Sequence, residues 1–205
     1  MYIPKHYEIT DFEEIRDFIE KHSFATLVTT HEGKPLATHL PLELVKRGDD
    51  YYLTGHLAYR NPQWQTFGDA PVLVMFQGPH AYISSSWYQT EDVPTWNYQA
   101  VHVYGTATIM EEQELKDDLS RLLQNYESHR KNPILWEKLS PQAKKQIKGI
   151  VGFKVKVEDV QAAYKLSQTR PEVDYENIVE QLSQADDLNS QQLAEAMKAN
   201  RQKGD

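Results

Sequence analysis

The chain has 205 residues, 40% hydrophobic and 25% charged, which suffices for a folded domain with a core and argues against wholesale disorder. It contains no cysteine, which excludes disulfides, thiolate metal sites, iron–sulfur clusters and cysteine nucleophiles. The formal net charge of −8 argues against a general polyanion binder, because neutralising phosphates requires a basic surface.

The sequence also indicates the cellular compartment of the protein. The segment from Met1 to Tyr7 lacks the apolar run of a signal peptide, and apolar runs such as residues 71–76 are too short to span a bilayer. The absence of cysteine fits a reducing compartment. We therefore expect a cytoplasmic protein without a membrane partner.

The first third of the chain is typical of one helix followed by antiparallel hairpins. Thr10 and Glu13 have capping-box spacing at the start of a helix expected from Asp11 to about His22. The strands expected next are residues 24–30, 35–45 and 51–56, separated by turns at 31–34 and 47–50. Short sequential hairpins favour an antiparallel meander over βαβ units.

The middle of the chain predicts more strands and an aromatic loop. Asn61 and Pro62 suit the N-cap and first position of a short helix. The strands expected after it are residues 70–78, 81–85 and 100–110. The loop from Trp87 to Tyr98 is rich in Trp and Tyr, so it must cover core, a cofactor or a second subunit.

The last part of the chain predicts further helices and one strand. The helices are expected at residues 111–131, from Ser140-Pro141, and at about 174–183 and 189–198, with a strand at 151–157. Six or more antiparallel strands with peripheral helices favour a small closed or split barrel, because closure removes exposed strand edges. We expect a barrel domain over residues 1–170 and a C-terminal helical tail over 171–205 that packs on it.

Four clusters of polar and basic residues are candidates for chemistry. In residues 37–42, a strand would place Thr38 and Leu40 on one face and His39 on the other. Residues 55–62 combine a glycine that permits close backbone approach with a helix start whose N–H groups, beside Arg60, suit a phosphate. Each has a structural alternative: a solvent-facing strand histidine, or an Asn-Pro helix start with a surface arginine.

The other two clusters lie later in the chain. Residues 93–98 offer aromatic faces that could flank a planar ring, anchor a loop or form a dimer interface. Residues 165–170 combine Lys165 and Arg170 with small polar donors, which suits a phosphate or a solvated connector. Nucleophile motifs and defensible metal-ligand spacings are missing, so any catalysis would belong to a bound cofactor.

Six segments carry a resemblance to a known family. They are Met1–Pro4, Ala37–Pro41, His56–Ala58 with Arg60–Trp64, Ala81–Ser84 with Ser86–Tyr88, Val93–Tyr98, and Lys165–Gln168. In this order they resemble the PaiB family, the FMN-binding negative transcriptional regulators, over nearly the whole chain. The string Pro94-Thr95-Trp96-Asn97-Tyr98 is especially specific.

The resemblance implies a β-rich α+β fold, an FMN-binding split β-barrel of the pyridoxamine-phosphate-oxidase type, with flavin sites at the interface of a homodimer. Carried over by position, the residues that would line the flavin site are Thr38, His39, Leu40, Gly55 and His56. Arg60 and Asn61 would hold the phosphate end, and Trp96 and Asn97 would border the ring. The remaining polar contacts would come from Lys165, Ser167 and Gln168.

Two positions depart from the family pattern. Ser85 stands where we expect proline, and Thr169 stands where we expect asparagine. Neither should alter the fold. The second falls in the segment expected to hold phosphate and puts tight flavin binding in doubt.

Three functions compete. The resemblance implies a negative transcriptional regulator of protease synthesis and sporulation. A flavin-dependent oxidoreductase or flavin reductase would explain the lack of protein nucleophiles; no residue is assigned a catalytic role. Haem binding or degradation would need His39, His56, His80 or His102 as an axial ligand, and a structural histidine is favoured at each.

Direct DNA contact would need a concentrated DNA-reading element. The helix of residues 190–201 is the candidate, but the preceding helix carries acidic side chains that suit phosphates badly. We favour a plain helical hairpin that packs through Ile178, Leu182, Leu193 and Met197, with regulation through a protein or metabolite.

Overall fold

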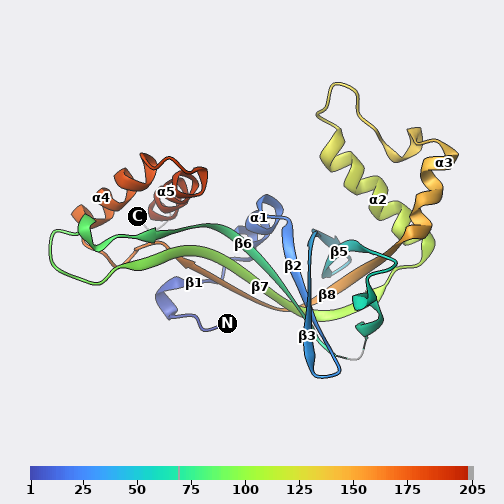
Figure 1. Cartoon of the computed structure of the whole chain (residues 1–205), viewed down its shortest axis with the longest axis horizontal. Helices are drawn as coiled ribbons and strands as arrows, with labels where there is room; N and C mark the ends of the chain where they lie inside the picture. Colours follow the sequence, from blue (N-terminus) through green and yellow to red (C-terminus); the bar gives the residue numbers. More distant parts are fainter. Residues whose placement is uncertain (69, 203–205) are drawn as a thin grey trace. The chain divides into compact units, whose positions relative to one another are not determined.

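The computed structural model describes residues 1–68 and 70–202 (Figure 1). These residues form two compact units. Unit 1 contains Met1–Phe18, Phe76–His102 and residues 161–202, and unit 2 contains Ile19–Met75 and Val103–Val160. Three long strands have residues in both units: β6 (Val72–Ile83), β7 (Thr95–Ile109) and β8 (Ile150–Lys165).

Unit 2 is built on an antiparallel sheet in the order β3-β2-β6-β7-β8-β5-β4. Its other strands are β2 (Phe24–His31), β3 (Lys34–Pro41), β4 (Glu43–Arg47) and β5 (Asp50–Ala58). The β2–β3 hairpin turns at Glu32 and Gly33, which both have positive φ (50° and 76°), as a tight two-residue hairpin requires. Its register places Thr26 opposite His39. The helical segments of unit 2 are η2 (Pro62–Thr66), α2 (Glu112–Glu127), η4 (Trp136–Lys138), α3 (Pro141–Lys144) and η5 (Lys145–Gly149).

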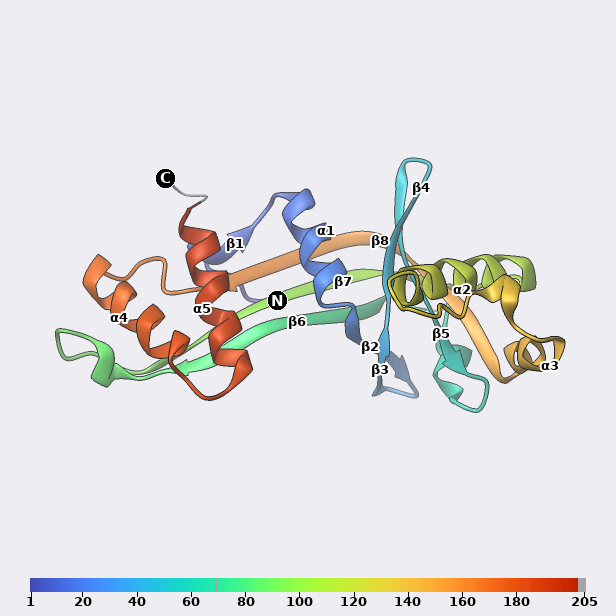
Figure 2. The same ribbon diagram turned by 90° about the horizontal axis from the view of Figure 1, so that it is seen from above.

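In unit 1 the strand order is β6-β7-β8, with the short β1 (Glu8–Ile9) paired to β8. The helical segments are η1 (Lys5–Tyr7), α1 (Phe12–Lys21, whose last turn lies in unit 2), η3 (Ser85–Trp87), α4 (Glu172–Ser183) and α5 (Leu188–Arg201). Figures 1 and 2 show α4 and α5 as a hairpin beside the unit 1 strands. The four residues expected to pack the hairpin, Ile178, Leu182, Leu193 and Met197, are all buried. The domain boundary at residue 170 stays a prediction.

Most expected elements are present, but several of their limits were wrong. The strand expected at 35–45 is two strands, broken at Leu42, whose N–H donates to Ser23 O. The strands expected at 70–78 and 81–85 are one strand, because Gly78 lies within β6 and does not form a turn. Packing requires the glycine there, since a Cβ would lie 2.7 Å from Phe18 Cε2. Helix α1 is capped by Asp11, whose Oδ1 accepts from Glu13 N–H, and not by Thr10.

Two further strands are longer than expected. β7 begins at Thr95, so Trp96, Asn97 and Tyr98 lie in a strand and not in a loop. β8 continues to Lys165, well past the expected end at 157. The extension of β7 and the part of β8 from Gln161 onward belong to unit 1, and they determine which side chains of residues 95–97 and 165–167 share a surface.

Candidate functional site

In unit 2, Thr38 and Asn61 belong to one hydrogen-bonded network. Asn61 Nδ2 donates to Thr38 Oγ1 (2.9 Å), and Thr38 Oγ1 donates to Gln63 Oε1 (2.5 Å). Gln63 is buried, and its Nε2 donates to the carbonyls of Leu27 and Leu36. Asn61 also caps η2, as expected, by accepting from Gln63 N–H. The network therefore fixes η2 against the β2–β3 hairpin; sequence reasoning missed Gln63.

The alternation expected in β3 is present. Leu40 is buried and Thr38 half-buried, whereas His39 is exposed on the opposite face. His39 Nδ1 lies 2.9 Å from Thr26 Oγ1, and its ring stacks on Phe24 at a centroid distance of 6.3 Å. Phe24 is 68% exposed and His39 is exposed too, so both residues of this stacked pair are accessible to solvent.

Gly55, His56 and Arg60 differ in what they offer a ligand. Gly55 is buried, and a Cβ there would lie 2.6 Å from Leu42 Cδ2, so packing already requires the glycine. His56 Nδ1 is buried, with no hydrogen-bond partner among the described residues. Burial lowers the His56 pKa, while the charge of Asp118 opposes the shift. Arg60 is exposed.

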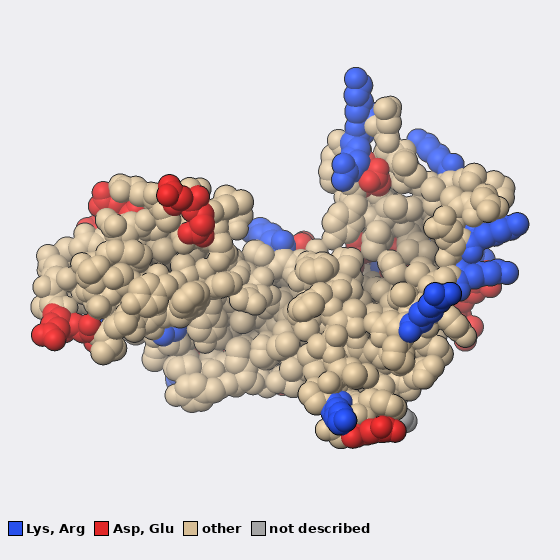
Figure 3. Space-filling view, in the orientation of Figure 1, with Lys and Arg blue, Asp and Glu red and all other residues tan. Residues whose placement is uncertain are grey.

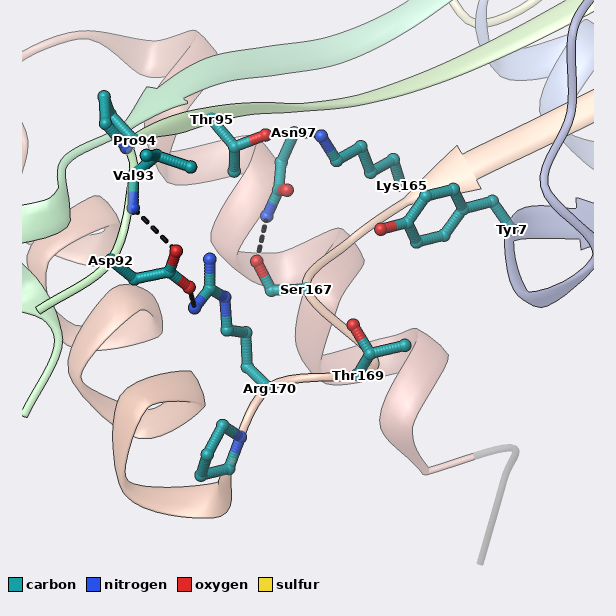
Figure 4. Close-up of a pocket in the computed structure, with 11 residues that line it drawn as sticks. Tyr7, Asp92, Val93, Pro94, Thr95, Asn97, Lys165, Ser167, Thr169 and Arg170 are labelled. Carbon is teal, nitrogen blue, oxygen red and sulfur yellow. Dashed lines mark hydrogen bonds and ion pairs between the residues drawn. The ribbon is translucent and has the colours of Figure 1, made fainter. Parts of the chain in front are cut away.

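Unit 1 contains a cavity of about 400 Å³ (Figure 4). Its walls come from β7 and the segment before it, from the turn after β8, and from the N-terminal Tyr7. The polar and charged side chains that line it are those of Tyr7, Asp92, Thr95, Asn97, Lys165, Ser167, Thr169 and Arg170. Two cations and several hydroxyl groups around one cavity suit an anionic, hydroxyl-bearing ligand.

Asn97 and Ser167 form the buried part of the cavity wall. Asn97 Nδ2 donates to Ser167 Oγ (2.8 Å), while Asn97 Oδ1 is buried without a hydrogen-bond partner among the described residues. Ser167 has φ +59°, a left-handed conformation that costs a non-glycine residue about 1 kcal/mol or more. A buried unpaired acceptor beside a strained residue is a feature of binding sites.

Gln168 holds the turn that presents Ser167. Its Oε1 accepts from Leu166 N–H (2.7 Å), and its Nε2 donates to Tyr164 O (2.6 Å). It is not among the residues that line the cavity. In this structure Gln168 therefore positions the turn, whereas the resemblance implied a direct polar contact.

The two cations of the cavity have different surroundings. Arg170 Nη1 pairs with Asp92 Oδ2 at 2.5 Å, and the guanidinium lies 4.1 Å from the centroid of the Tyr88 ring. Lys165 Nζ donates to Thr95 Oγ1, and its pKa is lowered by burial and by the nearby charge of Arg170. Within the described part of the chain, Lys165 has no carboxylate partner.

Trp96 lies on the other side of β7 from Asn97. The residue is 49% exposed, and its Nε1 donates to His80 Nδ1 (3.2 Å). Unit 1 thus brings together Asn97, Lys165 and Ser167 of the predicted residues, while Trp96 and Gln168 face elsewhere. Asp92 and Thr95 were missed, although they adjoin or lie within the segment that carries the resemblance.

The comparisons with known proteins agree with the resemblance. Residues 1–159 match the family described as "Putative FMN-binding domain". The "Protease synthase and sporulation protein PAI 2" of Bacillus subtilis is 60% identical over 199 residues, 96% of each chain. The chain belongs to the PaiB family. The alignment with the Bacillus subtilis protein extends past residue 159, where the family model ends, over the segment that supplies five of the eleven residues lining the unit 1 cavity.

Solved structures support the fold. The flavocytochrome Anf3 from Azotobacter vinelandii superposes with a TM-score of 0.63 at 14% identity, covering 85% of this chain and 78% of that one. An FAD and heme binding protein from Mycobacterium smegmatis gives 0.59 at 15% identity, with coverages of 78% and 73%. The expected fold class, an antiparallel sheet with peripheral helices of the flavin-binding split-barrel type, is confirmed. Among the described residues, no helix has the length and apolar character needed to cross a membrane.

The unit 1 cavity meets the requirements of a flavin mononucleotide at its phosphate-bearing end. Lys165 and Arg170 supply positive charge, Thr95 and Ser167 supply hydroxyl groups, and the unpaired Asn97 Oδ1 needs a donor such as a ribityl hydroxyl. In unit 2, by contrast, the groups of Thr38 and Asn61 already satisfy each other. His39 and Arg60 are the predicted unit 2 residues that are exposed.

Proposed function

We propose that this protein binds FMN and acts as a negative transcriptional regulator of protease synthesis and sporulation. The family description and the name of the Bacillus subtilis relative support the proposal. The observation that carries the binding part is the unit 1 cavity, with Lys165 and Arg170 beside a buried acceptor that lacks a partner. Asp92 pairs with Arg170, whereas Lys165 has only the hydroxyl of Thr95 among the described residues, so the lining keeps a cation that an anionic ligand can pair with.

In this proposal Lys165, Arg170 and Thr95 hold the phosphate, and Asn97 and Ser167 contact the ribityl chain. The resemblance assigns the phosphate instead to Arg60 and Asn61. It also places Thr38, His39, Leu40, Gly55 and His56 along the flavin and Trp96 at its ring. When bound, FMN would supply a redox-active ring. The homodimer that the resemblance implies stays part of the proposal.

A flavin titration tests the proposal and locates the phosphate. FMN absorbance or fluorescence is followed as the full-length protein is added, for the wild type and for Lys165→Gln, Arg60→Gln and the control Lys198→Gln. Loss of a charge-assisted contact of about 1.5–3 kcal/mol should weaken FMN binding by Lys165→Gln at least about tenfold. The control removes an exposed lysine of α5 and should change nothing.

The opposite pattern would place the phosphate at Arg60: a tenfold loss in Arg60→Gln with Lys165→Gln unchanged. Failure of the wild type to bind FMN would remove the cofactor from the proposal and leave regulation to a protein or metabolite partner. If the protein binds FMN and the bound flavin oxidises NADH with turnover, the oxidoreductase alternative gains the support that the regulator lacks.

A further inference from the structure

We propose that Asp92 occupies the place of an anionic ligand at Arg170, and that the unit 1 cavity thereby selects a terminal phosphate group. The identity of the whole ligand as FMN rests on the proposed function, but the phosphate selectivity does not. Neither Asp92 nor Arg170 was among the residues that the resemblance assigned to the flavin.

The geometry indicates which partner of the ion pair leaves. Arg170 is held from two sides, by Asp92 at 2.5 Å and by the Tyr88 ring at 4.1 Å. Its side chain is 21% exposed, whereas that of Asp92 is 45% exposed. The guanidinium can therefore stay against the ring while the more exposed carboxylate, whose other contact is the N–H of the adjacent Val93, turns outward into water, which solvates it well.

The charge balance indicates what replaces Asp92. The side chains that line the cavity include two cations and the carboxylate of Asp92, and the charge of Asp174, a buried carboxylate outside the lining, also acts on Arg170. When Asp92 turns away, Lys165 and Arg170 together match the two negative charges of a terminal phosphate monoester. The pKa of Lys165 is already lowered in part by Arg170, and an anion between them would relieve that repulsion.

The guanidinium also has the geometry for this exchange. A guanidinium can bind carboxylate and phosphate oxygens in the same planar, two-pronged way, and Arg170 uses one N–H on Asp92 Oδ2, so it can accept a phosphate oxygen in place of the carboxylate. A neutral ligand such as riboflavin would not displace Asp92. The cavity should therefore discriminate FMN from riboflavin through a competitor built into the chain.

The experiment compares Asp92→Asn, Arg170→Gln and the double variant with the wild type, each titrated with FMN, riboflavin and inorganic phosphate. Asparagine keeps the shape and the contact with Val93 N–H but removes the charge that pairs with Arg170. The Asp92–Arg170 pair is partly exposed and therefore a weak competitor, so Asp92→Asn should bind FMN and phosphate roughly threefold more tightly. Arg170→Gln should bind FMN roughly tenfold more weakly.

Two comparisons distinguish competition between Asp92 and the phosphate for Arg170 from simpler effects. Glu91→Gln makes the same charge change at the adjacent exposed residue and should leave affinity unchanged, which removes net charge as the cause. In the double variant, Asp92→Asn should not increase the affinity for FMN or phosphate, because the guanidinium for which Asp92 competes is no longer there. Circular dichroism melts confirm that each variant is folded.

The outcomes distinguish this inference from the proposed function. If FMN binds and Asp92→Asn behaves like Glu91→Gln or binds more weakly, the inference that Asp92 competes with the phosphate is wrong, while flavin binding stands. If FMN fails to bind but inorganic phosphate follows the expected order of variants, the phosphate site stands and the flavin proposal fails. If neither ligand binds the wild type, both fail.

Discussion

At the scale of single residues, some glycines of this chain have no room for a side chain, whereas others have open space where a side chain would lie. Gly105 in β7 has no room for a side chain, because a Cβ there would lie 1.8 Å from the carbonyl oxygen of Lys156 in β8. Gly149 at the end of η5 has nothing within 4 Å of its Cβ direction and no positive φ. The two positions thus form a matched pair for the same substitution.

We expect Gly105→Ala to lower the free energy of unfolding by about 3 kcal/mol or more, because the backbone of β8 has to move away. Gly149→Ala should change it by less than about 0.5 kcal/mol. Urea unfolding followed by circular dichroism measures both. A Gly105→Ala protein as stable as the wild type would show that β7 and β8 do not approach this closely in unit 2.

At the candidate site, the sequence predicted some of the residues correctly and could not predict others. Lys165 and Asn97 were predicted because they stand in family-specific strings, and the structure places both at one cavity. Asp92 and Arg170 became recognisable as partners only once the turn after β8 was known, since 78 positions separate them in the chain. Gly55 was interpreted as a ligand contact, but the structure shows that Leu42 uses its space.

At the scale of elements, the long strands were the hardest to predict. Local patterns gave the hairpins and helices well, because turn glycines and capping residues act over a few positions. They could not show that β6 runs through Gly78-Pro79 or that β8 continues to Lys165, because those extensions depend on partners distant in the sequence. The function of Gly78 became clear only from Phe18, which packs where its side chain would be.

The α4–α5 hairpin protects an edge of the unit 1 strands. In that unit β6 is the outer strand, and Asn189 at the start of α5 bonds both backbone groups of His80. Asn189 Nδ2 donates to His80 O (2.5 Å), and Asn189 Oδ1 accepts from His80 N–H (3.4 Å). One side chain thus takes the position of a neighbouring strand, which is a known way to shield an exposed edge.

Asn189→Ala should free that edge. We expect amide hydrogen exchange to speed up in β6 near His80 and in the first turn of α5, with a loss of about 1–2 kcal/mol in the free energy of unfolding. Gln192→Ala, an exposed position on the same helix, is the control and should exchange like the wild type. Unchanged exchange in Asn189→Ala would mean that apolar packing of the hairpin alone holds it to β6.

At the scale of the whole molecule, the net charge of −8 is unevenly distributed. Exposed acidic side chains lie on α4 at Glu172, Glu176 and Glu180, while Asp174 of the same helix is buried. Lysine and arginine side chains gather over the region of α2 and α3 (Figure 3). Residues 130–148 hold Arg130, Lys131, Lys138, Lys144, Lys145 and Lys148, with Glu137 as the acid among them.

This distribution decides which surface could meet DNA if regulation is direct. The tail helices, which the sequence suggested as a candidate reader, present acids next to any phosphate they would approach, whereas residues 130–148 present a local excess of cations. We expect a labelled 20-base-pair duplex to bind weakly at low salt. The logarithm of the association constant should fall against the logarithm of salt concentration with a slope no steeper than about −5, since at most about six phosphates can be neutralised there.

A charge-neutralised variant tests that assignment. Lys144→Gln, Lys145→Gln and Lys148→Gln combined should reduce duplex binding and flatten the salt slope by about 3. The matched control removes three lysines elsewhere, Lys5→Gln, Lys34→Gln and Lys198→Gln, with the same change in net charge. Equal losses in both triple variants would mean that only the total charge matters and that residues 130–148 are an ordinary solvated surface. No duplex binding by the wild type even at low salt would mean that the proposed regulation acts through a protein or metabolite partner.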